Sequence, residues 1–88
     1  MAGRMKYRSR TDIVSQMLEA ANGGATKTKI MYSAYLSYAQ LKEYLTVLVE
    51  GGLMEYQPAE QKYRTTEKGI KFLSTYSQIG QMIAATEK

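Results

Sequence analysis

Positively charged side chains gather at a few places in the chain, and a set of polar side chains accompanies them. Lysine and arginine outnumber aspartate and glutamate by 12 to 8, which gives a net charge of +4. The charged candidates for contact with phosphate are Arg4, Lys6, Arg8, Arg10, Lys27, Lys29, Lys62 and Arg64. The candidates for contact with phosphates or base edges are Ser37, Tyr38, Gln40 and Lys42. These residue types favour binding to a polyanion such as nucleic acid.

The basic residues are densest at the N-terminus of the chain. Arg4, Lys6, Arg8 and Arg10 all precede the first acidic residue, Asp12. Residues 1–8 show no periodic apolar pattern, so we expect a flexible basic arm that adds mobile positive charge beside a polyanion. A short basic terminus is also typical of a solubilising tail, and the composition alone leaves both interpretations open.

The composition argues against an enzyme. The chain has no histidine and no cysteine, which removes the usual general base, the thiol nucleophile and the preferred zinc ligands. We therefore expect no catalytic site, no metal and no cofactor. The apolar residues form no run of membrane-spanning length, and no apolar segment follows the basic start as in a signal peptide. A cytoplasmic protein is expected.

Apolar spacing, capping residues and glycines predict six elements in a single small domain. In chain order they are helices over 11–21, 26–33 and 37–50, strands over 53–57 and 62–65, and a last helix over 67–88. This is the order of a winged helix-turn-helix, a mainly α fold with a β-hairpin wing (α+β). Residues 9–66 would form the winged domain, and the C-terminal helix would extend beyond it.

The helix over 37–50 is the one that this fold would offer to DNA. Ser37 is its predicted N-cap, and Gln40 completes a capping box three residues later. Its core-facing stripe consists of Leu41, Tyr44, Leu45 and Leu48, at helical spacing. The other face presents Tyr38, Gln40 and Lys42, which we predict to lie nearest the bases of a major groove. On periodicity alone, these residues are equally typical of a solvated face.

Positive side chains on neighbouring elements are predicted to hold phosphates. Lys27 and Lys29 lie near the start of the helix over 26–33, where backbone N–H groups add positive potential. Lys62 and Arg64 share one face of the second strand by period-two alternation. The predicted inward anchors of the hairpin are Leu53 and Tyr63. Both pairs of cations are also typical of solvated faces.

Tyrosine is unusually frequent, with eight residues against one phenylalanine and no tryptophan. A tyrosine cluster stacks on unpaired bases in some single-strand-binding proteins. Here Tyr32, Tyr35, Tyr38 and Tyr44 fall within a helical hairpin instead of along an open sheet face. We therefore expect their commoner role, in which the ring is buried and the hydroxyl stays in water.

The last helix carries an apolar seam. Its members are Phe72, Tyr76, Ile79, Met82 and Ile83. Three small helices and a hairpin can cover only the beginning of this seam, so it either folds back on its own core or packs on a second copy. We favour a homodimer interface. Gly80 interrupts the seam and weakens the helix by roughly 1 kcal/mol relative to alanine.

Three segments resemble those of a known family. They are Lys27-Thr28-Lys29-Ile30-Met31-Tyr32, Leu36-Ser37-Tyr38-Ala39-Gln40-Leu41 and Tyr63-Arg64-Thr65-Thr66-Glu67-Lys68-Gly69. The chain, of 9.9 kDa, thereby resembles the archaeal single-domain winged-helix DNA-binding proteins, which are of similar mass and include transcriptional regulators and chromosomal proteins. The resemblance covers roughly Ser9 to Tyr76. It implies that the helix over 37–50 is a recognition helix, that 53–65 forms the wing, and that the C-terminal helix joins a dimer.

The leading hypothesis is a homodimeric protein that binds double-stranded DNA at the nucleoid, either as a transcriptional regulator or as an architectural chromosomal protein. The alternative is a winged-helix interaction module within a transcription or replication complex, because winged helices serve both purposes. The basic arm favours DNA, whereas Glu43 and Glu50 on the predicted recognition helix favour a protein partner.

Overall fold

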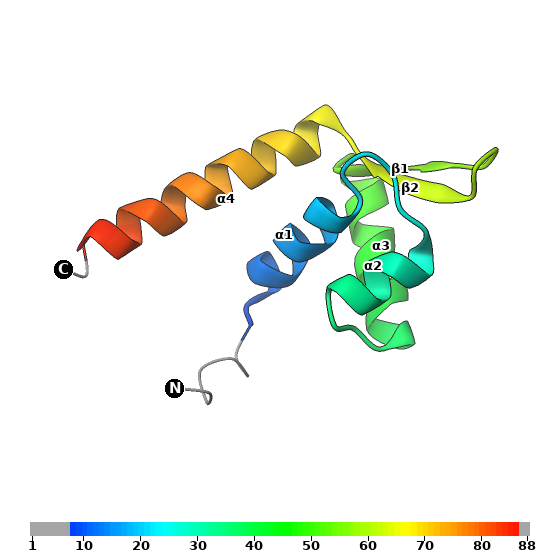
Figure 1. The fold of residues 1–88 in the computed structure, drawn as a ribbon, viewed down its shortest axis with the longest axis horizontal. Coiled ribbons are helices and arrows are strands. Elements are labelled where there is room, and N and C mark those ends of the chain that lie inside the picture. Colours follow the sequence, from blue (N-terminus) through cyan, green and yellow to red (C-terminus); the bar gives the residue numbers. More distant parts are fainter. Residues whose placement is uncertain (1–7, 87–88) are drawn as a thin grey trace.

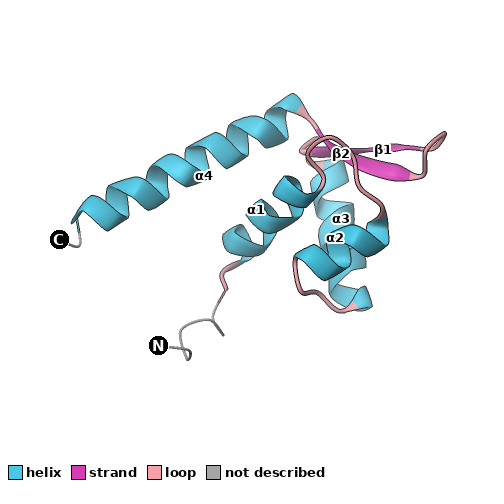
Figure 2. Cartoon of the chain, viewed as in Figure 1, coloured by secondary structure: helices cyan, strands magenta, loops and turns pink. Residues whose placement is uncertain are grey.

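The computed structural model describes residues 8–86, and their side chains through residue 84. In chain order the elements are α1 (Arg10–Ala20), α2 (Lys27–Ser33), α3 (Tyr38–Glu50), β1 (Met54–Gln57), β2 (Lys62–Thr65) and α4 (Glu67–Thr86). Figures 1 and 2 show the three short helices together, the hairpin at one end of them, and α4 running back beside α1. The predicted winged helix-turn-helix with a C-terminal helix is confirmed.

Each of the first three helices begins at a side chain that caps it. Ser9 and Asp12 form a capping box at the start of α1, so this helix begins one residue before the predicted start. Thr26 accepts from the backbone N–H of Lys29. Ser37 and Gln40 form the predicted capping box of α3. These caps satisfy backbone donors that the first helical turn leaves unpaired, and they fix where each helix enters the domain.

The core lies where α1, α2 and α3 meet the start of the hairpin. Its largest fully buried side chains are Met17, Leu18, Ile30, Leu41, Leu48 and Met54. Leu45 is also buried, and Tyr44 packs against the cluster while partly exposed. The predicted inward stripe of α3 is therefore confirmed, and the orientation of the exposed side of this helix follows from it.

The hairpin presents a different inward face on its first strand from the one we predicted. Met54 pairs with Thr65 and Tyr56 pairs with Tyr63, so these side chains share the inward face of the wing. The inward anchor of β1 is Met54, which is fully buried. Leu53, the predicted anchor, precedes the strand and packs against the core while partly exposed. Tyr63 faces inward as predicted and is partly buried.

The base of the wing is fastened to the helices. Ala25 and Tyr63 form a two-way backbone bridge with N···O distances of 2.9 and 2.8 Å. The hydroxyl of Thr65 donates to the carbonyl oxygen of Leu18 at 2.6 Å. These bonds hold β2 against α1 and the segment that follows it, so the base of the wing is fixed to the helical part of the domain.

Helix α4 leaves the wing and passes beside α1 (Figure 1). Gly69 lies in its first turn, where a Cβ would be 2.5 Å from Cγ2 of Thr65 and closer still to the carbonyl oxygen of Leu53. We expected Gly80 to interrupt the apolar seam. The helix nevertheless continues through Gly80 to Thr86. Among the helices of residues 8–86, none is long and apolar enough to cross a membrane.

Candidate nucleic-acid interface

Two lysines converge on one tyrosine at the start of α3. The Nζ atom of Lys27 lies 5.9 Å from the ring centroid of Tyr38, and the Nζ atom of Lys42 lies 5.6 Å from it. The Tyr38 side chain is 56% exposed. We call Lys27, Tyr38 and Lys42 the Tyr38 cluster. The electron-rich face of the ring attracts both ammonium groups, so it offsets part of their mutual repulsion and concentrates positive charge there.

The local sequence explains why these three side chains meet. The caps at Thr26 and Ser37 make Lys27 the first residue of α2 and Tyr38 the first residue of α3. Lys42 follows Tyr38 by four residues, which places both on one side of the helix. The dipole of α3 also adds positive potential at this end of the helix. The cluster is therefore a site suited to phosphate.

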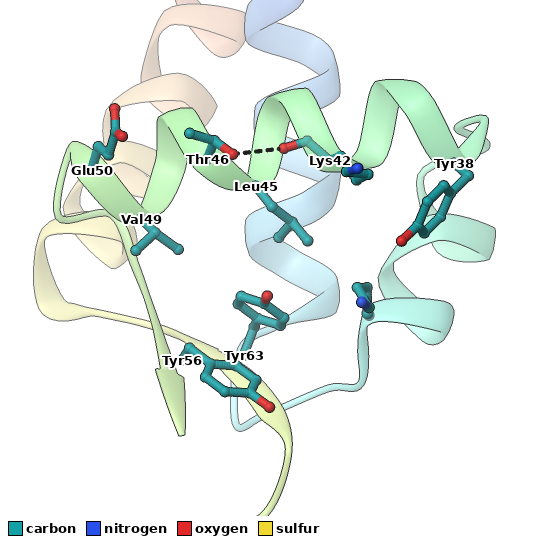
Figure 3. Close-up of a pocket in the computed structure, with 9 residues that line it drawn as sticks. Tyr38, Lys42, Leu45, Thr46, Val49, Glu50, Tyr56 and Tyr63 are labelled. Carbon is teal, nitrogen blue, oxygen red and sulfur yellow. Dashed lines mark hydrogen bonds between the residues drawn. The ribbon is translucent and has the colours of Figure 1, made fainter. Parts of the chain in front are cut away.

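A groove runs from the Tyr38 cluster along the side of α3 that faces the wing (Figure 3). It has a volume of about 440 Å³. Its lining residues are Lys27, Tyr38, Lys42, Leu45, Thr46, Val49, Glu50, Tyr56 and Tyr63. We call it the α3–wing groove. One wall comes from α3 and the other from the two tyrosines of the hairpin.

Ser37 and Gln40 lie elsewhere on α3 and are already engaged. The Oε1 atom of Gln40 accepts from the backbone N–H of Ser37, and the Ser37 hydroxyl accepts from the backbone N–H of Gln40. Gln40 follows Tyr38 by two residues, roughly 200° around the helix, so it does not line the groove. Bidentate readout of adenine needs both ends of a glutamine amide, and here the oxygen is occupied by the cap.

Arg8 does not behave as part of a mobile arm. Its guanidinium donates to Oε1 of Gln16, to the carbonyl oxygen of Ala34 at 2.6 Å and to the carbonyl oxygen of Tyr35 at 3.1 Å. These carbonyls lie at the end of α2, where Tyr35 has a left-handed backbone with φ of 55°. Arg8 therefore joins α1 to the turn between α2 and α3, and the structure differs here from the expected flexible arm.

The remaining predicted phosphate contacts are spread over the surface. Arg4 and Lys6 lie outside the described residues. Arg10, Lys29, Lys62 and Arg64 are exposed, and Arg64 stands opposite Glu55 across the hairpin. None of these four lines the α3–wing groove with the Tyr38 cluster. The structure thus brings Lys27, Tyr38 and Lys42 together and leaves the others apart.

The predicted dimer seam divides into two parts. Phe72 and Tyr76 are half-buried within the chain, and their rings stack with centroids 6.4 Å apart. Ile79 is 51% exposed and Ile83 is 54% exposed. Met82, the other member, is 67% exposed. The first part of the seam therefore folds back toward α1, whereas the second part lies on the surface.

A hydrogen bond from Tyr76 connects α4 to α1. The Tyr76 hydroxyl donates to Oδ1 of Asp12, whose Oδ2 accepts from the backbone N–H of Ser9 at 3.0 Å. Both bonds favour the charged carboxylate, and they lower the pKa of Asp12. The same carboxylate raises the pKa of Tyr76. One acid thus serves as the cap of α1 and as the acceptor for α4.

Sequence reasoning missed two features of this surface. Tyr56 was not among the predicted site residues, although period-two alternation from Met54 places it on the inward face of β1 and next to α3. Arg8 was predicted as an arm residue, and no sequence signal pointed to the carbonyls that it binds. Those carbonyls are 26 and 27 residues away along the chain, so only the folded turn brings them to it.

A family model described as winged helix-turn-helix matches residues 7–84. The chain belongs to this winged helix-turn-helix family. Among solved structures it is similar to Sso10a-2, a DNA-binding protein from Sulfolobus solfataricus, with a TM-score of 0.76 and 21% sequence identity. The match covers 91% of this chain and 90% of that chain. No curated protein sequence matches it.

Both findings confirm the family resemblance drawn from the sequence motifs. The family match covers the Tyr38 cluster, the wing and most of α4, so the winged fold extends over nearly the whole described chain. At 21% identity, the likeness to Sso10a-2 shows a shared fold. A shared fold does not determine function, which depends on the side chains at the surface of this chain.

Proposed function

We propose that this winged helix-turn-helix protein binds double-stranded DNA through the first turns of α3. The observation that carries the proposal is the Tyr38 cluster, in which Lys27 and Lys42 lie within 6 Å of the Tyr38 ring centroid. Two cations on adjacent helices, beside the exposed start of α3, match the phosphates that border a major groove. The +4 net charge of the chain adds attraction at long range.

Phosphate contacts dominate the proposed binding. Lys29, Lys62 and Arg64 extend the positive surface along α2 and the wing, and Arg10 extends it at α1. Arg4 and Lys6 would add contacts from the N-terminal segment. Such contacts set the position of a protein on DNA without reading its sequence. We assign Arg8 to the turn between α2 and α3, where it would position α3 indirectly.

Base readout is proposed to be weak. Ser37 and Gln40 use their side-chain oxygens to cap α3, which holds both side chains at the start of the helix. Strong discrimination between base pairs usually depends on bidentate side chains. A protein with this arrangement suits an architectural role at the nucleoid better than the control of a single operator.

We also propose that the protein acts as a homodimer joined through the end of α4. Ile79 and Ile83 are each more than half exposed and lie beside the half-buried Phe72 and Tyr76, with Met82 nearby. A hollow of about 520 Å³ between the start of α1 and this part of α4 is lined by Phe72, Tyr76, Ile79 and Ile83, together with polar residues of both helices and Ser9. A second copy of the helix would cover an apolar surface that is otherwise unfavourable in water.

A second candidate function rests on the outer side of α3. Glu43 is exposed there, and Val47 is 58% exposed. A carboxylate repels phosphate and attracts a cationic group, so this side of α3 suits a basic protein partner better than DNA. If the protein docks onto a basic partner in a transcription or replication complex, this side of α3 is the surface that it would use.

The test measures affinity for a labelled random-sequence duplex by fluorescence anisotropy at several salt concentrations. Each phosphate contact contributes roughly 0.9 to the slope of log affinity against log salt, so the Lys27→Gln, Lys42→Gln variant should lose about 1.8 from the slope. Lys71→Gln is the control with one charge removed from the exposed surface of α4.

The slope of the Lys71→Gln control should stay at the wild-type value. A double variant whose slope also equals the wild-type value would show that the Tyr38 cluster is not the DNA contact. Absence of duplex binding at low salt would instead favour the second candidate function, in which the outer side of α3 docks onto a protein partner.

A further inference from the structure

The α3–wing groove has an aromatic wall that duplex contacts at the Tyr38 cluster do not use. Tyr56 is 45% exposed, and its ring lies against that of Tyr63 with centroids 4.8 Å apart. Both tyrosines line the groove across from Leu45 and Val49 of α3 (Figure 3). Aromatic and apolar side chains that line an open groove mark a binding site more often than a plain surface.

The chemistry of the groove changes along its length. Lys27 and Lys42 make one end positive, and Glu50 lies at the other end of α3 (Figure 3). The tyrosines and aliphatic residues lie between these ends. Since two ammonium groups already occupy the surroundings of the Tyr38 ring, Tyr56 offers the ring that remains for stacking. A fitting ligand has an anionic group at the lysines and a flat ring between α3 and the wing.

Double-stranded DNA does not offer such a ring, because its base faces are stacked inside the duplex. An unpaired strand exposes the face of every base. Proteins that bind single strands combine a positive groove for the backbone with aromatic side chains on which bases stack. The groove has both parts, and its 440 Å³ is in the range of a site for a small ligand.

We propose that the α3–wing groove binds an unpaired DNA strand. A phosphate of the strand lies at Lys27 and Lys42, and the adjacent base lies against Tyr56. Glu50 repels phosphate at the far end, so the strand leaves the groove before reaching it. The proposal rests on the proposed DNA-binding function, because the same two lysines hold a phosphate in both cases.

The test compares a labelled oligo(dT) with a duplex of equal length by fluorescence anisotropy. Tyr56→Leu removes the stacking ring and keeps an apolar side chain in the wing. The matched control is Tyr32→Leu, because Tyr32 is 69% exposed on α2 and does not line the groove. Tyr56→Leu should weaken oligo(dT) binding about fivefold or more. Tyr32→Leu should leave it unchanged, and duplex affinity should stay at the wild-type value in both variants.

Salt distinguishes the ring from the lysines. Stacking of a base on a ring releases no counterions. The factor by which Tyr56→Leu weakens oligo(dT) binding should therefore be equal at low and high salt. The Lys27→Gln, Lys42→Gln variant should instead lose slope on oligo(dT) as well as on duplex. Circular dichroism of each variant confirms that the fold is retained.

The outcomes separate this inference from the proposed function. Oligo(dT) affinity that is equal in the wild type, Tyr56→Leu and Tyr32→Leu overturns the groove proposal, even where duplex binding depends on the lysines. Equal losses on oligo(dT) and duplex in Tyr56→Leu also overturn it, because they show a general effect on the wing. Absence of duplex binding together with Tyr56-dependent oligo(dT) binding overturns the duplex function and supports the groove.

Discussion

Gly69 lies where α4 leaves the wing, and its replacement by alanine should lower the free energy of unfolding. The added Cβ would be 2.5 Å from Cγ2 of Thr65 and closer to the carbonyl oxygen of Leu53, whereas ordinary contact begins near 3.4 Å. The start of α4 must therefore move by about 1 Å. The Leu53 oxygen also accepts from the backbone N–H of Thr66 at 3.1 Å, so the movement strains the bond that begins this helix.

The size of the effect follows from two opposing contributions. Overpacking of this kind costs about 1–3 kcal/mol, and alanine regains up to about 1 kcal/mol of helix propensity over glycine. The expected net loss is therefore up to about 2 kcal/mol, and each kcal/mol lowers the melting temperature of a domain of this size by roughly 4–8 °C. Gly80→Ala is the matched control, because nothing lies within 4 Å of a Cβ added there.

The assay is thermal and urea unfolding followed by circular dichroism. All variants are compared at one protomer concentration, because association raises the apparent stability of a dimer. Gly69→Ala should melt below the wild type. The Gly80→Ala control gains helix propensity without a clash and should melt at or above the wild-type temperature. If Gly69→Ala proves as stable as the wild type, the close approach between α4 and the end of the core is refuted.

Two further predictions concern α4 and its contact with α1. The pKa of Asp12 is held below its ordinary value of 3.8 by hydrogen bonds from Tyr76 and Ser9, so its stabilising effect is complete above that pH and is lost as the pH falls through the lowered pKa. Asp12→Asn should flatten this acid loss in urea titrations, and an unchanged pH dependence would contradict the assignment. Ile79→Asp with Ile83→Asp should give monomers in analytical ultracentrifugation, because buried unpaired carboxylates oppose association. Dimers that persist would place the interface elsewhere.

Local signals in the sequence were enough to predict the fold. The Ser37–Gln40 capping box fixed the start of α3, and the leucines at helical spacing fixed its buried side. Both depend on neighbours within one or two helical turns. The hairpin was harder, because successive side chains of a strand point to opposite faces, and an error of one residue in this alternation exchanges the two faces. The anchor of β1 is therefore Met54 and not Leu53.

The candidate site could be predicted only in part, because its geometry depends on contacts between elements. Lys27 and Lys42 were both expected to contact DNA, but their convergence on Tyr38 needs α2 and α3 in their folded arrangement. The same capping box that identified α3 also occupies the oxygen of Gln40, which weakens its predicted role as a base reader. Arg8 had no local partner to reveal its place at the end of α2.

The most direct test of the central claim is a titration of isotope-labelled protein with a short DNA duplex, followed through backbone amide chemical shifts. If the Tyr38 cluster binds DNA, the changes are saturable and largest at Lys27 and over residues 38–46, with small changes along the end of α4. Changes confined to the outer side of α3 around Val47, or to α4, would contradict the claim that the Tyr38 cluster is the surface that meets DNA.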